Sequence, residues 1–253
     1  MKIEKRQVKD KMLQITTSDE RWYLNEDTGI YRPSTTWIAS YYPKGVGFYK
    51  WLAEHGWDEA EAIKKEAGES GSKVHQAIDV LIKGGEVKID DKFINNSTGV
   101  AEELTPEEYY CAITFKEWVD EVKPKFIANE YIIEKEICED DAEDDSNKGY
   151  AGTVDIKCEI DGQLWIVDIK TSANIWESHM VQVNMYKDAD PDKEKLRMAI
   201  LQVGYTRNKT KQYKFTEVED MPEIVRSCRA IWKREAGKIV PKQKDYPLII
   251  KLN

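Results

Sequence analysis

The stretch Gly149-YAGTVDIKCEIDGQLWIVDI-Lys170 predicts a β-hairpin at the centre of the fold. Asp161-Gly162 is a strong signal for a two-residue hairpin loop, because β-rich runs flank it and both loop positions require a positive φ. Ile160 and Gln163 then form the first pair of opposite residues. Continued along both strands, this register pairs the residues that carry polar side chains: Asp155 with Asp168, and Thr153 with Lys170.

The two faces of this hairpin differ in chemistry, because successive side chains of a strand point to opposite sides. Asp155, Asp168 and Lys170 share one face. Like charges opposite each other destabilise a sheet, and a divalent cation between them would offset that cost. The polar face therefore predicts a metal site; the alternative is a solvated outer face. The other face is apolar and comprises Val154, Ile156, Cys158, Ile160, Trp165, Val167 and Ile169.

Four motifs occur in a fixed order along the chain. Gly71-Ser-Lys-Val-His75 lies on a predicted helix, Gly152-Thr-Val-Asp155 and Val167-Asp-Ile-Lys-Thr-Ser172 form the hairpin, and Gln182-Val-Asn-Met-Tyr186 follows on another predicted helix. In this order they resemble the PD-(D/E)XK nucleases, in the RecB-like exonuclease branch. The resemblance runs from about residue 30 to about residue 205. Its start, Pro33 to Trp37 followed by Trp51 and Gly56-Trp57, is similar to the lead-in of phage-type members.

The resemblance implies an α/β fold with a restriction-endonuclease-like three-layer core, in which helices flank a mixed central sheet, and with an N-terminal helical lead-in. A chain of 253 residues is long enough for one large domain. We expect a single nuclease domain over residues 1–253. Its parts are a mainly helical segment 1–123 that carries His75, a core sheet 124–206 with the catalytic hairpin, and a basic strand and helix 207–253.

Hydrophobic periodicity and turn residues predict the remaining elements. Thr105-Pro-Glu-Glu108 is a capping box that opens a helix to about Val122. Gly68 and Gly71 separate a helix through Trp51–Ala67 from one at about 72–83. The other expected elements are a small N-terminal hairpin, strands at about 126–137, 196–206 and 212–216, and helices at 174–187 and 219–238.

Phosphodiester hydrolysis needs an activated water and a positive charge beside the phosphate, and Mg²⁺ or Mn²⁺ supplies both. Magnesium prefers oxygen ligands, so Asp155 and Asp168 are the expected protein ligands, and the resemblance adds the backbone carbonyl of Ile169. Lys170 lies two residues beyond Asp168, on the same face, where it can reach the attacking water or the phosphate. The alternative for Lys170 is a surface lysine at the end of a strand.

The resemblance implies further site residues. His75 would be another metal ligand; otherwise it is a surface or core histidine. Glu130 would correspond to an additional acidic ligand, and Glu134 is the alternative because both lie on one face of the predicted strand. Gln182 and Tyr186 are one helical turn apart and would orient Lys170 or contact phosphate, and His179 lies on the same helix face. The alternative places Tyr186 in the core and Gln182 on the surface.

The net charge is −9, and its distribution is uneven. Residues 1–186 carry 22 Lys and Arg against 37 Asp and Glu, or −15, whereas residues 187–253 carry 16 against 10, or +6. The acidic run from Glu134 to Asp145 is expected to be a solvated loop, with a guard against duplex DNA as the alternative. The expected phosphate contacts therefore lie after the motifs, at Arg207, Lys209, Lys211 and Lys214.

Together these features predict a metal-dependent DNA exonuclease of recombination, repair or end resection in a bacterial cell or a phage-infected host. The alternatives are a structure-specific or nonspecific endonuclease and a non-catalytic DNA-binding module. No phosphate-binding G-x-x-x-x-G-K-[ST] motif is present, so unwinding would need a helicase partner. Ring-forming relatives leave a homo-oligomer open. Neither a membrane-spanning run nor a signal-peptide core is visible, so we expect a cytoplasmic protein.

The four cysteines predict no metal cluster. Cys111, Cys138, Cys158 and Cys228 include no C-x-x-C pair, which argues against a zinc site or a disulfide framework. Some RecB-like nucleases hold an iron–sulfur cluster through a cysteine group near the C-terminus, and this chain lacks that group. We therefore expect no iron–sulfur cluster. The aromatic residues of the lead-in could stack on unpaired bases, although core packing is their more ordinary use: Trp37, Tyr41, Tyr42, Trp51 and Trp57.

Overall fold

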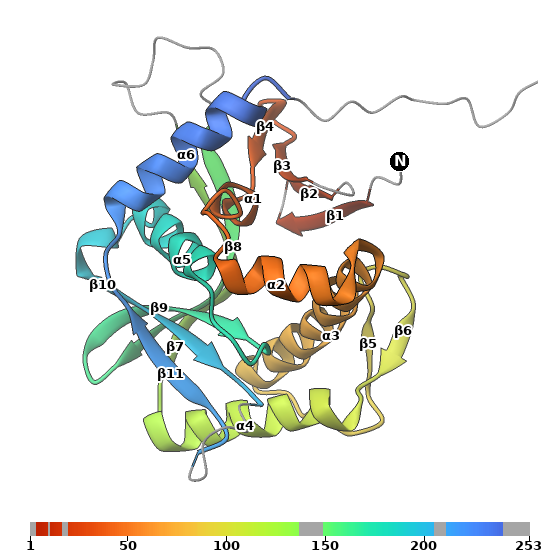
Figure 1. Cartoon of the computed structure of the whole chain (residues 1–253). Helices are drawn as coiled ribbons and strands as arrows, with labels where there is room; N and C mark the ends of the chain where they lie inside the picture. Colours follow the sequence, from red (N-terminus) through yellow and green to blue (C-terminus); the bar gives the residue numbers. More distant parts are fainter. Residues whose placement is uncertain (1–3, 10, 17–19, 137–148, 205–210, 240–253) are drawn as a thin grey trace, which may run out of the picture.

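A five-stranded mixed sheet lies at the centre of the protein (Figure 1). The computed structural model describes residues 4–9, 11–16, 20–136, 149–204 and 211–239. The strand order is β11-β10-β9-β8-β7, with β9 and β10 parallel and the other neighbours antiparallel. The strands are β7 (Lys125–Lys135), β8 (Tyr150–Ile160), β9 (Gln163–Lys170), β10 (Leu196–Gln202) and β11 (Lys214–Val218).

The predicted hairpin is confirmed, and so is its register at the loop end; the predicted pairs Asp155–Asp168 and Thr153–Lys170 lie beyond the last observed pair. Asp161 and Gly162 form the loop with φ values of 49° and 79°. The pairs between β8 and β9 run from Ile160–Gln163 to Ile156–Val167. The loop signal of Asp161-Gly162 was therefore sufficient to align the two strands at the hairpin end.

Helices cover both faces of the sheet (Figure 1), so the fold is α/β with three layers. On one side, Ile166 and Ile200 pack with residues of α1 (Thr35–Ala39), α5 (Glu177–Ala189) and α6 (Pro222–Ala236). On the other side, Val167 and Leu201 pack with residues of α3 (Trp57–Ile82) and α4 (Pro106–Val122). Parallel neighbours need a crossover connection, and α5 provides it between β9 and β10.

The hairpin is buried on both faces, so the alternative of a solvated outer face is wrong. Lys157, on the face expected to be polar, is only 7% exposed and its ammonium lies 2.7 Å from Asp190. The buried Ile166 joins the cluster around α5. A helix layer covers this face, and the polar site is confined to one end of the hairpin.

β8 is irregular at Asp155, which corrects the expected placement of Val154. Val154 belongs to the core cluster on the α5 side, whereas Ile156 belongs to the cluster on the α3 side. Residues two apart share a face in a regular strand, so the alternation shifts between them. The pairing with β9 also ends at Ile156–Val167. The irregularity lies where the candidate site begins.

A separate four-stranded antiparallel sheet forms the N-terminal part. It was expected to be a small hairpin within a mainly helical segment 1–123, and the structure corrects this. The sheet adjoins the central sheet: Ser34 bridges to Ala151, and the Tyr23 and Thr153 hydroxyls are 3.0 Å apart. Its strands are β1 (Glu4–Lys9), β2 (Met12–Thr16), β3 (Arg21–Asn25) and β4 (Ile30–Pro33).

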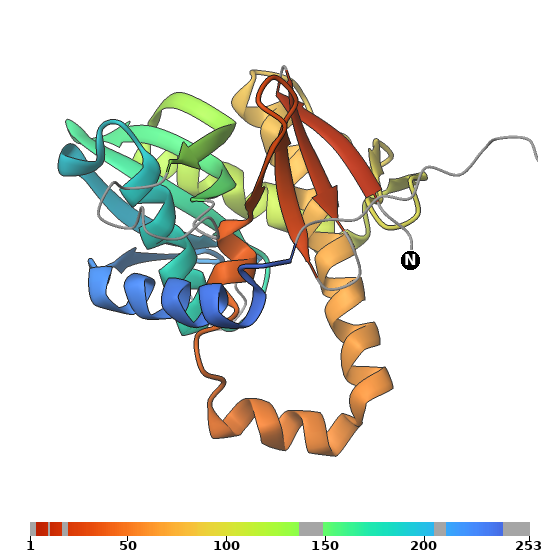
Figure 2. The same ribbon diagram turned by 90° about the horizontal axis from the view of Figure 1, so that it is seen from above.

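α2 (Val46–His55) and the first half of α3 project from the body as an arm (Figure 2). The expected break near Gly68 and Gly71 is wrong, because α3 is continuous from Trp57 to Ile82. Glycine disfavours a helix by only about 1 kcal/mol, a cost that packing of the second half of α3 can offset. That second half is the part that contacts the body, through buried residues that include Val74, Ala77 and Ile78.

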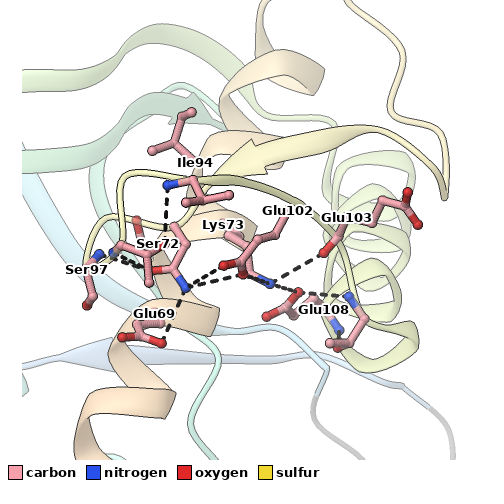
Figure 3. A network of polar contacts seen from close by, with 12 residues as sticks. Glu69, Ser72, Lys73, Ile94, Ser97, Glu102, Glu103 and Glu108 are labelled. Carbon is pink, nitrogen blue, oxygen red and sulfur yellow. Dashed lines mark hydrogen bonds and ion pairs between the residues drawn. The ribbon is translucent and has the colours of Figure 1, made fainter.

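A polar network attaches a two-stranded hairpin, β5 (Lys92–Ile94) and β6 (Ala101–Glu103), to α3 (Figure 3). The buried Lys73 ammonium lies 2.9 Å from Glu108 and 3.6 Å from Glu102. Asn95, also buried, donates to Glu102 at 3.2 Å. This network therefore ties α3 both to the hairpin and to Glu108 at the start of α4.

The remaining predicted elements are present with shifted ends. The capping box of α4 is confirmed, and Lys123 ends that helix with φ 53°. α5 begins at Glu177, three residues later than expected, and β11 is displaced by two residues. A short 3-10 helix precedes β10 at Lys193–Lys195. Among the described residues, no helix combines the length and the apolar character that a bilayer crossing needs.

Candidate metal centre

Three potential ligands from three different elements converge beside the central sheet. His75 comes from α3, Glu130 from β7 and Asp155 from β8. The Nδ1 atom of His75 lies 3.3 Å from Oδ1 of Asp155 and 3.6 Å from Oε1 of Glu130. One ligand atom from each residue lies within 4.8 Å of the other two. Ligands about 2.0–2.2 Å from a shared ion would be separated by such distances, so the three residues fit a single metal ion.

Glu130 joins this group through an unusual backbone conformation. Its φ is 45°, which is rare for a residue other than glycine and is strained within a strand. It lies between the pairs Asn129–Ile156 and Tyr131–Val154, opposite Asp155. Glu134 instead pairs with the buried Arg32. Of the two glutamates that the sequence left open, Glu130 is therefore the one at the candidate centre.

The carboxylate of Asp155 is oriented by the next strand. Its Oδ2 accepts a hydrogen bond from the backbone N–H of Ile169 at 2.7 Å, which leaves Oδ1 directed toward His75. Such a bond behind a ligand holds it in one orientation. The role of Ile169 seen here is that of a donor, and coordination by its carbonyl stays a prediction.

Asp168 and Lys170 lie at the end of β9 as a buried ion pair. Asp168 is 1% exposed, and its Oδ2 is 2.7 Å from the Lys170 ammonium. That oxygen has no properly oriented hydrogen-bond partner among the described residues. Burial raises the pKa of Asp168 to about 6, with Lys170 opposing and Asp155 adding to the shift. The close contact of this oxygen is with the Lys170 ammonium, so a metal ion here would share the carboxylate with Lys170.

The charges around His75 also favour a cation. Burial alone would lower the pKa of His75, but Asp155 and Glu130 raise it to about 10. Burial disfavours the Asp155 carboxylate, yet His75 and Lys170 bring its pKa below the usual value. Protonated His75 thus supplies the positive charge that the two carboxylates require, and a bound divalent ion could replace that proton.

Gln182 and Tyr186 contact each other on the face of α5 that points to the sheet, and both are buried. Burial and the carboxylates of Asp168 and Asp155 raise the pKa of Tyr186 well above 10, so its hydroxyl stays protonated close to the acidic group. Gly152 makes this approach possible, because a Cβ there would lie 2.7 Å from Cε1 of Tyr186. Because Gln182 is buried, the alternative that placed it on the surface is wrong.

His179 lies at the start of α5, where its Nδ1 accepts the backbone N–H of Trp176 at 3.4 Å. Burial lowers the pKa of His179 to about 3, with Lys170 and Lys44 acting in the same direction. It is therefore a neutral group beside the site. Trp176 precedes the first residue of this helix.

Sequence reasoning missed several neighbours of the site. The side chain of Thr35 on α1 lies against Gly152, and Gly71 faces the hydroxyl of Thr171, from which a Cβ would be 3.6 Å away. Arg21 and Lys44 act electrostatically on Lys170 and His179 respectively. These contacts join segments far apart in the chain, and no local pattern predicts them.

The four residues after position 186 that were expected to contact DNA do not form one group in the described structure. Arg207 and Lys209 lie outside the described residues. Lys211 is ion-paired with Glu121. Lys214 is at the same end of the sheet as Lys170, since Gln202 pairs with both residues. Most of the acidic run lies outside the described residues as well, from position 137 to 148.

Three of the four cysteines are buried free thiols, Cys111 and Cys158 in one core cluster and Cys228 in the other, and Cys138 lies outside the described residues. Burial raises the pKa of Cys111 to about 11 and that of Cys158 to about 12.

Comparison with known proteins adds no relative: no family model matches the chain, and no curated protein matches it.

Proposed function

We propose that this protein is a metal-dependent deoxyribonuclease that hydrolyses phosphodiester bonds, with the restriction-endonuclease-like fold and RecB-like exonuclease activity that its motifs resemble. The observation that carries the proposal is the convergence of His75, Glu130 and Asp155 beside the Asp168–Lys170 pair. These residues come from four elements, and the motif order assigned the same residue types to one site. A purely structural ion-pair cluster would not require the strained backbone of Glu130.

Mg²⁺ or Mn²⁺ is the proposed cofactor, and when bound it supplies Lewis-acid stabilisation and an activated water. Asp155, Glu130 and His75 would hold it, and the buried Asp168 carboxylate, shared with Lys170, would contribute beside them. Three carboxylates beside one histidine form an oxygen-rich set that suits these ions.

Lys170 is the proposed catalytic cation. Its ammonium, held 2.7 Å from Asp168, can donate to the attacking water or to a phosphate oxygen where negative charge develops. Gln182 and Tyr186 are proposed positioning groups, because their mutual contact fixes one face of α5 beside Asp168 and Asp155. The neutral Tyr186 hydroxyl can donate a hydrogen bond there.

The biological setting follows the same resemblance. We propose that the substrate is DNA with a free end, in bacterial or phage recombination, repair or end resection in the cytoplasm. A helicase would be a separate partner protein. The motif order supports exonuclease over endonuclease activity, and the fold itself is compatible with either.

The test is incubation of end-labelled linear DNA and closed circular DNA with Mg²⁺ or Mn²⁺, with EDTA as the metal-free control. Loss of linear DNA alone is the expected result. Nicking of the circle would identify an endonuclease of the same fold. Intact DNA of both forms, together with retained binding, would identify a non-catalytic DNA-binding protein and overturn the proposal.

A further inference from the structure

Two cations without carboxylate partners lie next to the candidate centre. Arg21, at the start of β3, and Lys44, just before α2, are both exposed. Neither side chain forms an ion pair in the described part of the chain; Lys44 only lies above the Phe48 ring, 5.8 Å from its centroid. Other described cations, such as Arg32, Lys73 and Lys157, are each paired with carboxylates.

The backbone of Arg21 is anchored beside the site, and the residues just before Lys44 pack on the core. The carbonyl of Arg21 accepts the N–H of Ser34 at 2.9 Å, and Ser34 bridges to Ala151, one residue before Gly152. Lys44 follows Tyr41 and Tyr42, which pack against the core cluster shared by α1 and α5. The charge of Arg21 acts on Lys170, and the charge of Lys44 acts on the neighbouring His179.

Cations placed beside another cation repel each other, so this arrangement is unfavourable without an anion. A chain with a net charge of −9 also gains DNA affinity only where positive charge is gathered. We propose that Arg21 and Lys44 form a phosphate-binding rim beside Lys170, and that the DNA backbone enters between the N-terminal sheet and the start of α2. This inference rests on the proposed function and moves the DNA path away from residues 207–214.

The experiment measures binding of a fluorescent DNA oligonucleotide across a salt series, with Ca²⁺ replacing Mg²⁺ and the DNA checked for cleavage on a gel. Arg21→Gln and Lys44→Gln are tested singly and together. The double variant should bind about tenfold more weakly, and its dependence of log affinity on log salt should flatten by about 1 per residue. Arg21→Lys should keep the parent slope, because it keeps the charge.

Lys195→Gln is the matched control. Lys195 is exposed and lies just before β10, at the opposite end of the sheet from Lys170, so its neutralisation should leave affinity and slope unchanged. The rim proposal is overturned if the double variant keeps the parent's dependence of log affinity on log salt. It is also overturned if only Lys211→Gln and Lys214→Gln, tested in the same way, reduce that dependence. Cleavage assays separate the two proposals. If the parent cleaves DNA and the double variant binds DNA normally, only the rim proposal fails. If the parent neither binds nor cleaves DNA, both proposals fail.

Discussion

The two oxygens of the Asp155 side chain serve different neighbours. Oδ2 accepts the Ile169 N–H, and Oδ1 faces His75. The hydrogen bond restricts rotation of the carboxylate, so less entropy would be lost if the proposed metal ion bound there. Glu130 is positioned differently, by the left-handed conformation of its backbone. At the scale of single residues, the site is preorganised by main-chain geometry.

Replacing Lys170 with alanine should abolish cleavage and leave DNA affinity within a few-fold of the parent. Lys170 is one cation among several beside the site, but its ammonium is the one held against Asp168. Single-turnover cleavage and equilibrium binding measure the two effects separately. Lys195→Ala is the control for loss of one positive charge, and retained cleavage in Lys170→Ala would remove this residue from the mechanism.

Replacing Asp168 with asparagine should abolish metal-dependent cleavage without destabilising the metal-free protein. Burial raises the pKa of this carboxyl, so its charged form is disfavoured in the folded state, and neutralisation also relieves a repulsion from Asp155 of at most about 1 kcal/mol. Lost attraction to Lys170 acts in the opposite direction. Thermal unfolding with and without Mn²⁺ is the measurement.

In this experiment the parent should gain stability with saturating Mn²⁺, and Asp168→Asn should lose most of that gain. An Asp168→Asn protein much less stable than the metal-free parent would contradict the argument. Asp168 would then be a structural partner of Lys170 and not a metal ligand.

At the scale of elements, β8 approaches α1 and α5 closely because residue 152 has no side chain. A Cβ on Gly152 would lie 2.7 Å from both Tyr186 Cε1 and Thr35 Oγ1. Gly152→Ala should therefore displace Tyr186, reduce turnover and lower the free energy of unfolding by about 1–3 kcal/mol. Gly47→Ala is the control, since nothing lies within 4 Å and alanine favours helix α2. Normal turnover in Gly152→Ala would exclude a positioning role for this contact.

The ion pair between α3 and α4 leads to a second prediction about these elements. Lys73→Met leaves the buried Glu108 without its ammonium partner, which should cost about 3–5 kcal/mol in unfolding free energy. Adding Glu108→Gln removes the uncompensated charge and should restore more than half of that loss. Chemical denaturation of both single variants and the double variant gives the coupling. Independent, additive losses would show that the pair contributes no interaction of its own.

Local signals predicted some elements and not others. The Asp161-Gly162 loop and the capping box at Thr105 act over a few residues, so both were predicted correctly from the sequence. The continuity of α3 through Gly71 depends on packing of its second half, and the N-terminal sheet consists of short strands with weak alternation. Glycine punctuation and periodicity carry no information about such tertiary support.

At the scale of the whole molecule, the sequence predicted which residue types meet, because the motifs surround one hairpin. It left Glu130 and Glu134 open, since both belong to the same strand and are distinguished by contacts with His75 and Arg32, which are distant in sequence. Arg21 reaches the site through the N-terminal sheet. Contacts of this kind depend on how separate sheets pack, and charge counts along the chain pointed to another region.

Three tryptophans join the two ends of the described chain to the central core. Trp22 of β3 contacts Trp37 of α1 at a centroid distance of 5.0 Å, and Trp37 contacts Trp232 of α6 at 5.3 Å. Trp22 and Trp232 are 0% and 4% exposed. Because one cluster connects the N-terminal sheet, α1 and α6, loss of one ring should weaken all three attachments together, as a single domain requires.

Trp232→Ala should lower the unfolding free energy by about 3–5 kcal/mol and keep one cooperative transition. The reason is that the cavity would open inside the cluster shared by the three segments and not at an edge. Far-ultraviolet circular dichroism and intrinsic fluorescence, followed through the same denaturant series, should give coincident curves. Trp57→Ala is the control: this ring is 67% exposed on the arm, so its loss should change stability by no more than about 0.5 kcal/mol. Two separate transitions in Trp232→Ala would instead mean that the N-terminal sheet or α6 unfolds independently of the core. The site could then keep its metal affinity after the N-terminal sheet, which carries Arg21, has unfolded.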